Sequence, residues 1–130
     1  MSWLFAPPPE PRSAWSVILW WEVRRVPYNL IVGGVGLLSL AAFLALIGHC
    51  GDVKPGEDAF EPILLFLTAI AANVCYTAGW VTEISLLRGH PSEPSIAPRL
   101  LRWGLAFSLF VVVLPAVVWA ITCVARAFGS

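Results

Sequence analysis

Three apolar runs constrain this chain more than any other feature of its sequence. They cover residues 28–50, 62–87 and 100–125. Each is longer than the roughly 20 residues with which a helix crosses the hydrocarbon core of a bilayer. Only Glu83 interrupts the second run, and Arg102 stands near the start of the third. Because a backbone in lipid must satisfy its own hydrogen bonds, each run is predicted to be helical.

The charge content supports the same interpretation. Hydrophobic residues make up 58% of the chain and charged residues 12%, whereas soluble domains carry about a quarter charged residues. The net charge is zero, which leaves no bulk positive field to attract nucleic acid. We therefore expect an all-α integral membrane protein whose surroundings are the lipid bilayer, with three transmembrane helices over about 28–50, 62–87 and 99–126.

Basic residues predict how these spans are threaded, because Lys and Arg near span ends stay in the cytoplasm. Two flanks that share one side of a three-span protein hold six of them: Arg12, Arg24, Arg25, Arg88, Arg99 and Arg102. The opposite side holds only Lys54 and Arg126. The sequence thus predicts a multi-pass protein of the cell membrane with a cytoplasmic N-terminus and an outer C-terminus. The acidic loop with Asp52, Glu57, Asp58 and Glu61 would also lie outside.

The segment before the first span is predicted to have two parts. Residues 1–12 are rich in proline and are expected to form a disordered tail. Residues 13–26 are expected to form a short amphipathic interfacial helix with Ser13 as its N-cap, anchored by tryptophans. Pro27 would then form an elbow before the membrane domain continues. Glu22 and Arg25 are three residues apart and can pair, which leaves Arg24 for lipid phosphate or another helix. This helix is interpreted as an anchor, or alternatively as a docking surface for a cytoplasmic partner.

The second span carries the polar residues that are candidates for function. Asn73, Tyr76, Thr77 and Glu83 fall on one half of its helical wheel, and polar side chains at membrane depth usually face protein or trapped water. They are expected either to join helices or to line a permeation or ligand path. Glu83 needs a partner to stay ionised, and the expected partners are Arg24, Arg25 or Arg102. The alternative role for Glu83 is that of a proton carrier or gate.

The sequence around the end of the first run contains metal-ligand types without a second cluster. His49, Cys50 and Asp52 lie close together, but no further histidine is expected on that side of the membrane. No metal, cofactor or catalytic residue is therefore predicted. Cys50 and Cys123 should both lie near the outer surface, where a disulfide can form in an oxidising compartment, and the sequence leaves its formation open.

These patterns predict a small non-enzymatic membrane subunit. It would assemble as a homo-oligomer or within a larger membrane complex, with the polar face of the second span at the interface. The alternative is an oligomeric channel, transporter or membrane-permeabilising effector lined by that same face, and an enzyme ranks third.

Overall fold

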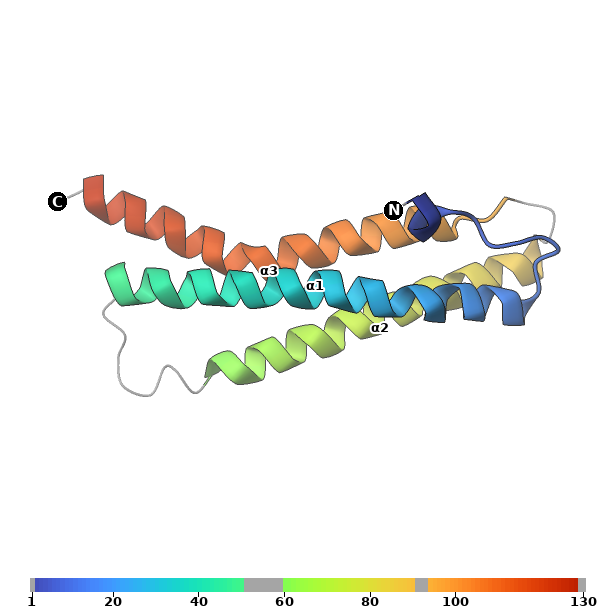
Figure 1. Cartoon of the computed structure of the whole chain (residues 1–130), viewed down its shortest axis with the longest axis horizontal. Coiled ribbons are helices and arrows are strands. Elements are labelled where there is room, and N and C mark those ends of the chain that lie inside the picture. The colour runs from blue at the N-terminus through green and yellow to red at the C-terminus, as the bar shows by residue number, and fades with distance from the viewer. Residues whose placement is uncertain (1, 51–59, 91–93, 129–130) are drawn as a thin grey trace.

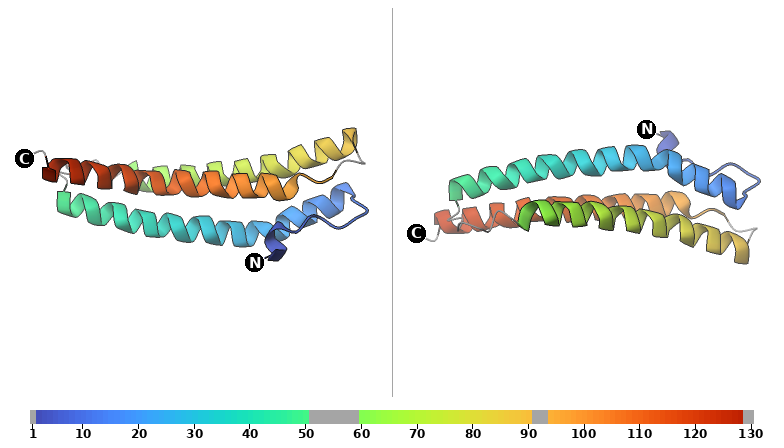
Figure 2. Two further views of the ribbon diagram at one scale, coloured as in Figure 1. Left: turned by 90° about the horizontal axis from the view of Figure 1, so that it is seen from above. Right: turned by 90° about the horizontal axis from the view of Figure 1, so that it is seen from below.

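The protein is built from helices that lie side by side. The computed structural model describes residues 2–50, 60–90 and 94–128, with the backbone alone at 2 and 60–65. A short 3-10 helix, η1 (Ser2–Phe5), precedes three long α-helices, α1 (Ala14–Cys50), α2 (Phe60–Gly89) and α3 (Ala97–Phe128). In the view of Figure 1 α1 appears between α2 and α3, and Figure 2 shows that it packs on one side of these two helices, which also contact each other. The all-α prediction is confirmed, and the described residues contain no strand.

Only two of the three helices are apolar enough along the described residues to qualify as spans. These are α1 and α3, judged by length and composition. The prediction of three such spans is therefore matched in part. The second predicted span, 62–87, lies within α2, a helix of 30 residues, but Asn73, Tyr76, Thr77 and Glu83 lower the hydropathy along its described residues. Lys54 and the acidic side chains of the loop before it lie outside the described residues.

The predicted division between an interfacial helix and a first span is wrong, because α1 is one continuous helix of 37 residues with Pro27 inside it. Ser13 caps its start as predicted, and its hydroxyl accepts the Ser16 amide N–H at 3.1 Å. Proline removes the helical hydrogen bond to the residue four positions earlier and bends a helix without necessarily ending it. The bend is visible in Figure 2.

The first half of α1 packs against the rest of the bundle. This packing explains why it does not form a separate helix on the lipid headgroups. Val17, Trp20, Trp21 and Arg24 are buried. Their spacing continues through Tyr28 and Val32 along one helical face. Elsewhere on this half of α1, Trp15, Leu19, Val23 and Val26 are exposed. Of the tryptophans that were expected to anchor the helix, Trp15 is exposed, but Trp20 and Trp21 are buried within the bundle.

The tail predicted to be disordered also differs from expectation. Residues 2–5 form η1, and Leu4 is buried in the hydrophobic core. The Nε of Arg24 donates to the Leu4 carbonyl at 2.8 Å, and the indole of Trp20 donates to the Ala6 carbonyl at 2.9 Å. The prolines suggested an extended chain, but these bonds to side chains of α1 hold the segment in place.

Most of the buried side chains of the described residues lie toward the end of the bundle that holds the N-terminal half of α1. Trp21 is 1% exposed and meets the ring of Tyr76 edge-on, with ring centroids 5.2 Å apart. Gly79 lets α2 approach this indole. A Cβ added at Gly79 would lie 2.9 Å from the Trp21 ring, which is closer than van der Waals contact.

Gly79→Ala is therefore expected to destabilise the protein, although alanine favours a helix by about 1 kcal/mol over glycine. Overpacking against a buried ring that cannot move costs typically 1–3 kcal/mol. Gly104→Ala is the matched control, because nothing lies within 4 Å of its added Cβ. Thermal melts in detergent should show a lower midpoint for Gly79→Ala and an unchanged or higher one for Gly104→Ala. Equal midpoints would mean that the indole has room to yield.

Candidate functional site

A pair of side-chain amides bridges α1 and α2. Asn29 donates to Asn73 Oδ1 at 3.4 Å, and Asn73 donates back to Asn29 Oδ1 at 3.3 Å. The second N–H of Asn73 reaches the carbonyl of Ala69 at 3.1 Å. No partner for the second N–H of Asn29 is found among the described residues, and Asn29 is exposed. The predicted role of Asn73 in joining helices is thus visible within one chain, through a residue that the sequence pattern did not single out.

Thr77 continues the polar contacts one turn further along α2. Its hydroxyl donates to the Asn73 carbonyl at 2.9 Å and accepts from Arg25 at 3.3 Å. Arg25 also pairs with Glu22 at 2.9 Å, as the spacing of three predicted. These contacts form a polar line, Glu22–Arg25–Thr77–Asn73–Asn29, between α1 and α2.

Tyr76 is buried next to this line. Its hydroxyl donates to the backbone carbonyl of Trp21, and the guanidinium of Arg25 lies 5.2 Å from its ring centroid. The neighbouring Tyr28 shares a buried hydrogen bond of 2.6 Å with Ser108 of α3. Tyr76 and Tyr28 therefore join the three helices through polar groups that are already satisfied, which fits a packing role.

Glu83 does not pair with Arg24, Arg25 or Arg102, so that prediction is wrong. Its carboxylate, 2% exposed, lies 3.5 Å from Arg12. It also accepts the Ser95 hydroxyl at 2.6 Å and the Ile96 amide at 3.2 Å. These donors stand just before the first turn of α3, where a negative charge complements the helix dipole. Glu83 thus joins α2, the start of α3 and the N-terminal segment.

Arg25, one of the three arginines expected to pair with Glu83, pairs with Glu22. The other two, Arg24 and Arg102, contact the N-terminal segment. Arg24 is buried and donates to the carbonyls of Leu4, Trp20 and Trp3, the last at 2.6 Å. Its guanidinium lies 3.9 Å from the Trp20 ring centroid. Arg102 lies over the ring of Phe5 at 4.9 Å. Arg24 and Arg102 therefore hold η1 against α1 and α3.

A groove opens between α1 and α2 beside the amide pair. It has a volume of about 320 Å³ and is mostly apolar. Its walls include Gly33 and Leu37 from α1 and Ala69 and Ala72 from α2, while its polar residues are Asn29, Thr68 and Asn73. The sequence predicted a polar half for α2, but it did not indicate that α1 would contribute Asn29 to the same surface. The sequence feature that could have indicated this contact is that Asn29 is a polar residue within the first apolar run, 28–50.

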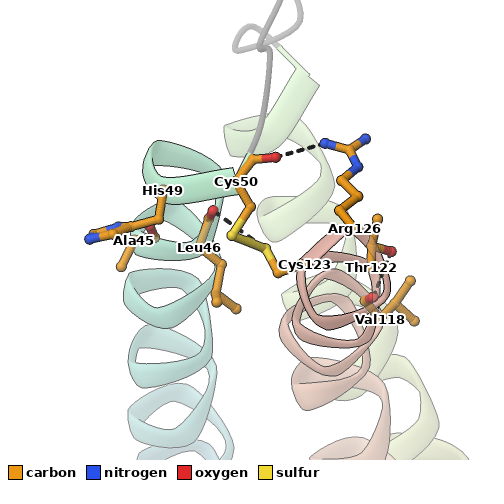
Figure 3. The surroundings of a disulfide bond; sticks show 8 residues. All are labelled: Ala45, Leu46, His49, Cys50, Val118, Thr122, Cys123 and Arg126. Atoms are coloured by element: carbon orange, nitrogen blue, oxygen red, sulfur yellow. Dashed lines mark hydrogen bonds between the residues drawn. A yellow bond between two sulfur atoms is a disulfide. The ribbon is translucent and has the colours of Figure 1, made fainter. Parts of the chain in front are cut away.

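At the opposite end of the bundle, Cys50 and Cys123 form a disulfide with their Cα atoms 5.6 Å apart. Figure 3 shows Arg126 of α3 donating to the Cys50 carbonyl beside it, at 2.7 Å. His49 bonds to the Ala45 carbonyl of its own helix at 2.7 Å. The part of the chain that the structure describes contains no cluster of side chains able to hold a metal ion, and Asp52 lies outside it.

Comparison with family models, curated proteins and solved structures finds no match to this chain.

Proposed function

We propose that this chain is a small non-enzymatic integral membrane protein with three spans that assembles with other membrane helices through the face formed by α1 and α2. The observation that carries the proposal is the Asn29–Asn73 pair. It lies beside a mostly apolar groove, with Asn29 exposed and one N–H of its amide without a described partner. In hydrocarbon a polar group without a partner costs several kcal/mol.

A bilayer environment is supported by how little of the long helices is buried. In the most apolar window of α1, and likewise of α3, only 11% is buried within the chain. The core helix of a soluble protein would be mostly covered. Large side chains point outward on every helix, among them Leu38 at 73%, Phe66 at 67% and Phe110 at 62% exposure. Lipid is the solvent in which such a surface is stable.

The length of α2 supports a third span, and the distribution of arginines supports the proposed orientation. The 30 residues of α2 extend about 45 Å, which exceeds the roughly 30 Å hydrocarbon core, and α2 contacts both neighbours. One end of the bundle holds the N-terminal segment together with six arginines: Arg12, Arg24, Arg25, Arg88, Arg99 and Arg102. The other end holds the disulfide and Arg126. This distribution supports an N-terminus in the cytoplasm and a C-terminus outside the cell membrane.

Assembly is expected to weaken when the amide of Asn73 is removed. Asn73→Leu eliminates both bonds of the pair and leaves Asn29 exposed. Because interhelical bonds in membranes contribute roughly 0.6–2 kcal/mol each, we expect the assembly to weaken about tenfold. Native mass measurement at graded detergent concentration gives the readout.

Thr82→Val is the matched control for Asn73→Leu. It also removes a polar group from α2, but the Thr82 hydroxyl bonds only to the Ala78 carbonyl of its own helix, at 2.8 Å. A wild-type protein that runs as a single copy without any associated protein contradicts the proposal. So does an assembly that responds equally to Asn73→Leu and Thr82→Val.

A channel, transporter or permeabilising effector would use the same face in another way. Ion flux into liposomes that contain the purified protein separates the two functions. The assembling subunit predicts no flux above that of empty liposomes, whereas flux that Asn73→Leu abolishes would favour a pore.

A further inference from the structure

Two exposed surfaces of the described chain share residues of α2. The first is the groove between α1 and α2 described above. The second is a shallow hollow of about 630 Å³ along α2, lined by Ala69, Ile70, Asn73, Val74, Thr77, Ala78 and Val81. Ala69 and Asn73 line both surfaces. The groove and the hollow therefore meet along one edge of α2, and that edge carries the amide pair.

We propose that the partner at this face is a second copy of the chain, related by a two-fold axis along the membrane normal that passes close to Ala69 and Asn73. This inference rests on the proposed membrane function. In a symmetric dimer the same patch is used by both copies. If the exposed side of α2 that bears the hollow packs into the groove of the other copy, the residues common to both surfaces must lie nearest the axis.

Depth in the membrane favours a second copy over a different helix. Two copies inserted in the same direction place identical residues at identical depth. Asn73 of one copy then stands level with Asn29 and Asn73 of the other, beside a groove whose other lining residues are apolar except Thr68. The pair of copies brings together two amide N–H groups without described partners and the remaining lone pairs of four amide oxygens. The donors and acceptors are thus matched by the chain itself.

Gly33 supplies room for the approach. Nothing within its own chain lies within 4 Å of a Cβ added at this position, although Gly33 lines the groove. A Cβ added at Gly36, one turn further, would lie 3.9 Å from Val112 of α3. Small residues at membrane helix interfaces allow backbones to approach closely. The space at Gly33 is therefore available to a partner and is not used by the fold of the single chain.

Cysteine cross-linking in native membranes tests the axis. Ala69→Cys, made together with Cys75→Ser, places the single free thiol of the described residues next to the predicted axis. The wild-type protein is the control, because its exposed Cys75 lies on the side of α2 that faces α3, with Phe107 and Val111 nearby. Mild oxidation should convert most of the Ala69→Cys protein into a covalent dimer and leave the wild-type protein as single chains. Equal cross-linking at both positions, or none at position 69, would overturn the proposal.

A side chain added at Gly33 tests the groove. Gly33→Leu should weaken the dimer about tenfold without lowering the thermal midpoint of the single chain, because its Cβ would meet no side chain of the described residues within 4 Å and the groove leaves room beyond it. Gly104→Leu, on α3, adds the same side chain in open space and should leave the dimer intact. If Gly33→Leu left the dimer unchanged, the groove would not be the interface.

The two proposals fail in different ways. If position 69 never cross-links but an Asn73-dependent complex with a different protein persists, the chain is still an assembling subunit and only the symmetric dimer is wrong. If the chain is monomeric and carries no associated protein, both proposals are wrong.

Discussion

Glu83→Ala is expected to lower the free energy of unfolding by about 3 kcal/mol, because breaking a buried, hydrogen-bonded charge pair typically costs 3–5 kcal/mol. The substitution removes the acceptor of the Ser95 hydroxyl and the Ile96 amide. It also leaves Arg12, whose side chain is 7% exposed, without this carboxylate. Three segments lose a common contact: α2, the start of α3 and the N-terminal segment. Thermal or denaturant melts of the purified protein in detergent provide the measurement.

Glu83→Gln should cost less, about 1–2 kcal/mol. Its amide oxygen can still accept one of the two hydrogen bonds, whereas its NH₂ group faces donors and no longer attracts Arg12. Glu22→Gln is the matched control, since it breaks the partly exposed pair with Arg25, and such pairs contribute under about 1 kcal/mol. Should Glu83→Ala melt like Glu22→Gln, the carboxylate would not hold the three segments together.

For Glu83, the sequence predicts that an ion pair forms but does not predict which arginine forms it. The single carboxylate in an apolar run predicted a buried ion pair on physical grounds, and such a pair exists. The identity of the partner depended on where the N-terminal segment folds. Prolines 7, 8, 9 and 11 favour an extended chain, and nothing local to them indicates that Arg24 binds the carbonyls of Trp3 and Leu4. The burial that orders this segment comes from residues far away in the sequence.

The long helices were the easiest feature to predict, because an apolar run of this length has few other stable forms. Their boundaries were harder to predict. Pro27 is compatible with either an elbow or a bent continuous helix, and burial of Trp21 against Gly79 and Tyr76 favours the second. For the candidate site, Asn73 was identified from the polar half of α2. Asn29 could not be paired with it without the relative rotation of α1 and α2, which only tertiary packing determines.

The disulfide is expected to have the second large effect on stability. Cys50 and Cys123 are separated by 73 positions in the sequence, and closing a loop of that size typically stabilises a protein by 2–4 kcal/mol. The double substitution Cys50→Ser and Cys123→Ser should lower the free energy of unfolding by about this amount. A reductant should destabilise the wild-type protein equally and leave the double variant unchanged. A reductant that shifts both proteins alike would show that the effect comes from elsewhere in the chain.

The same bond reports the orientation of the chain in the membrane. The disulfide joins the C-terminal ends of α1 and α3 (Figure 3), which lie on the outer side in the proposed threading. A reductant that cannot cross membranes should therefore open it in intact cells, and a thiol-reactive mass tag added afterwards should label both cysteines. Cys75 lies near the middle of α2 and is the internal reference, since its labelling should not depend on the reductant. If the bond opened only after the cells were permeabilised, the positive charges would face outward and the proposed threading would be inverted.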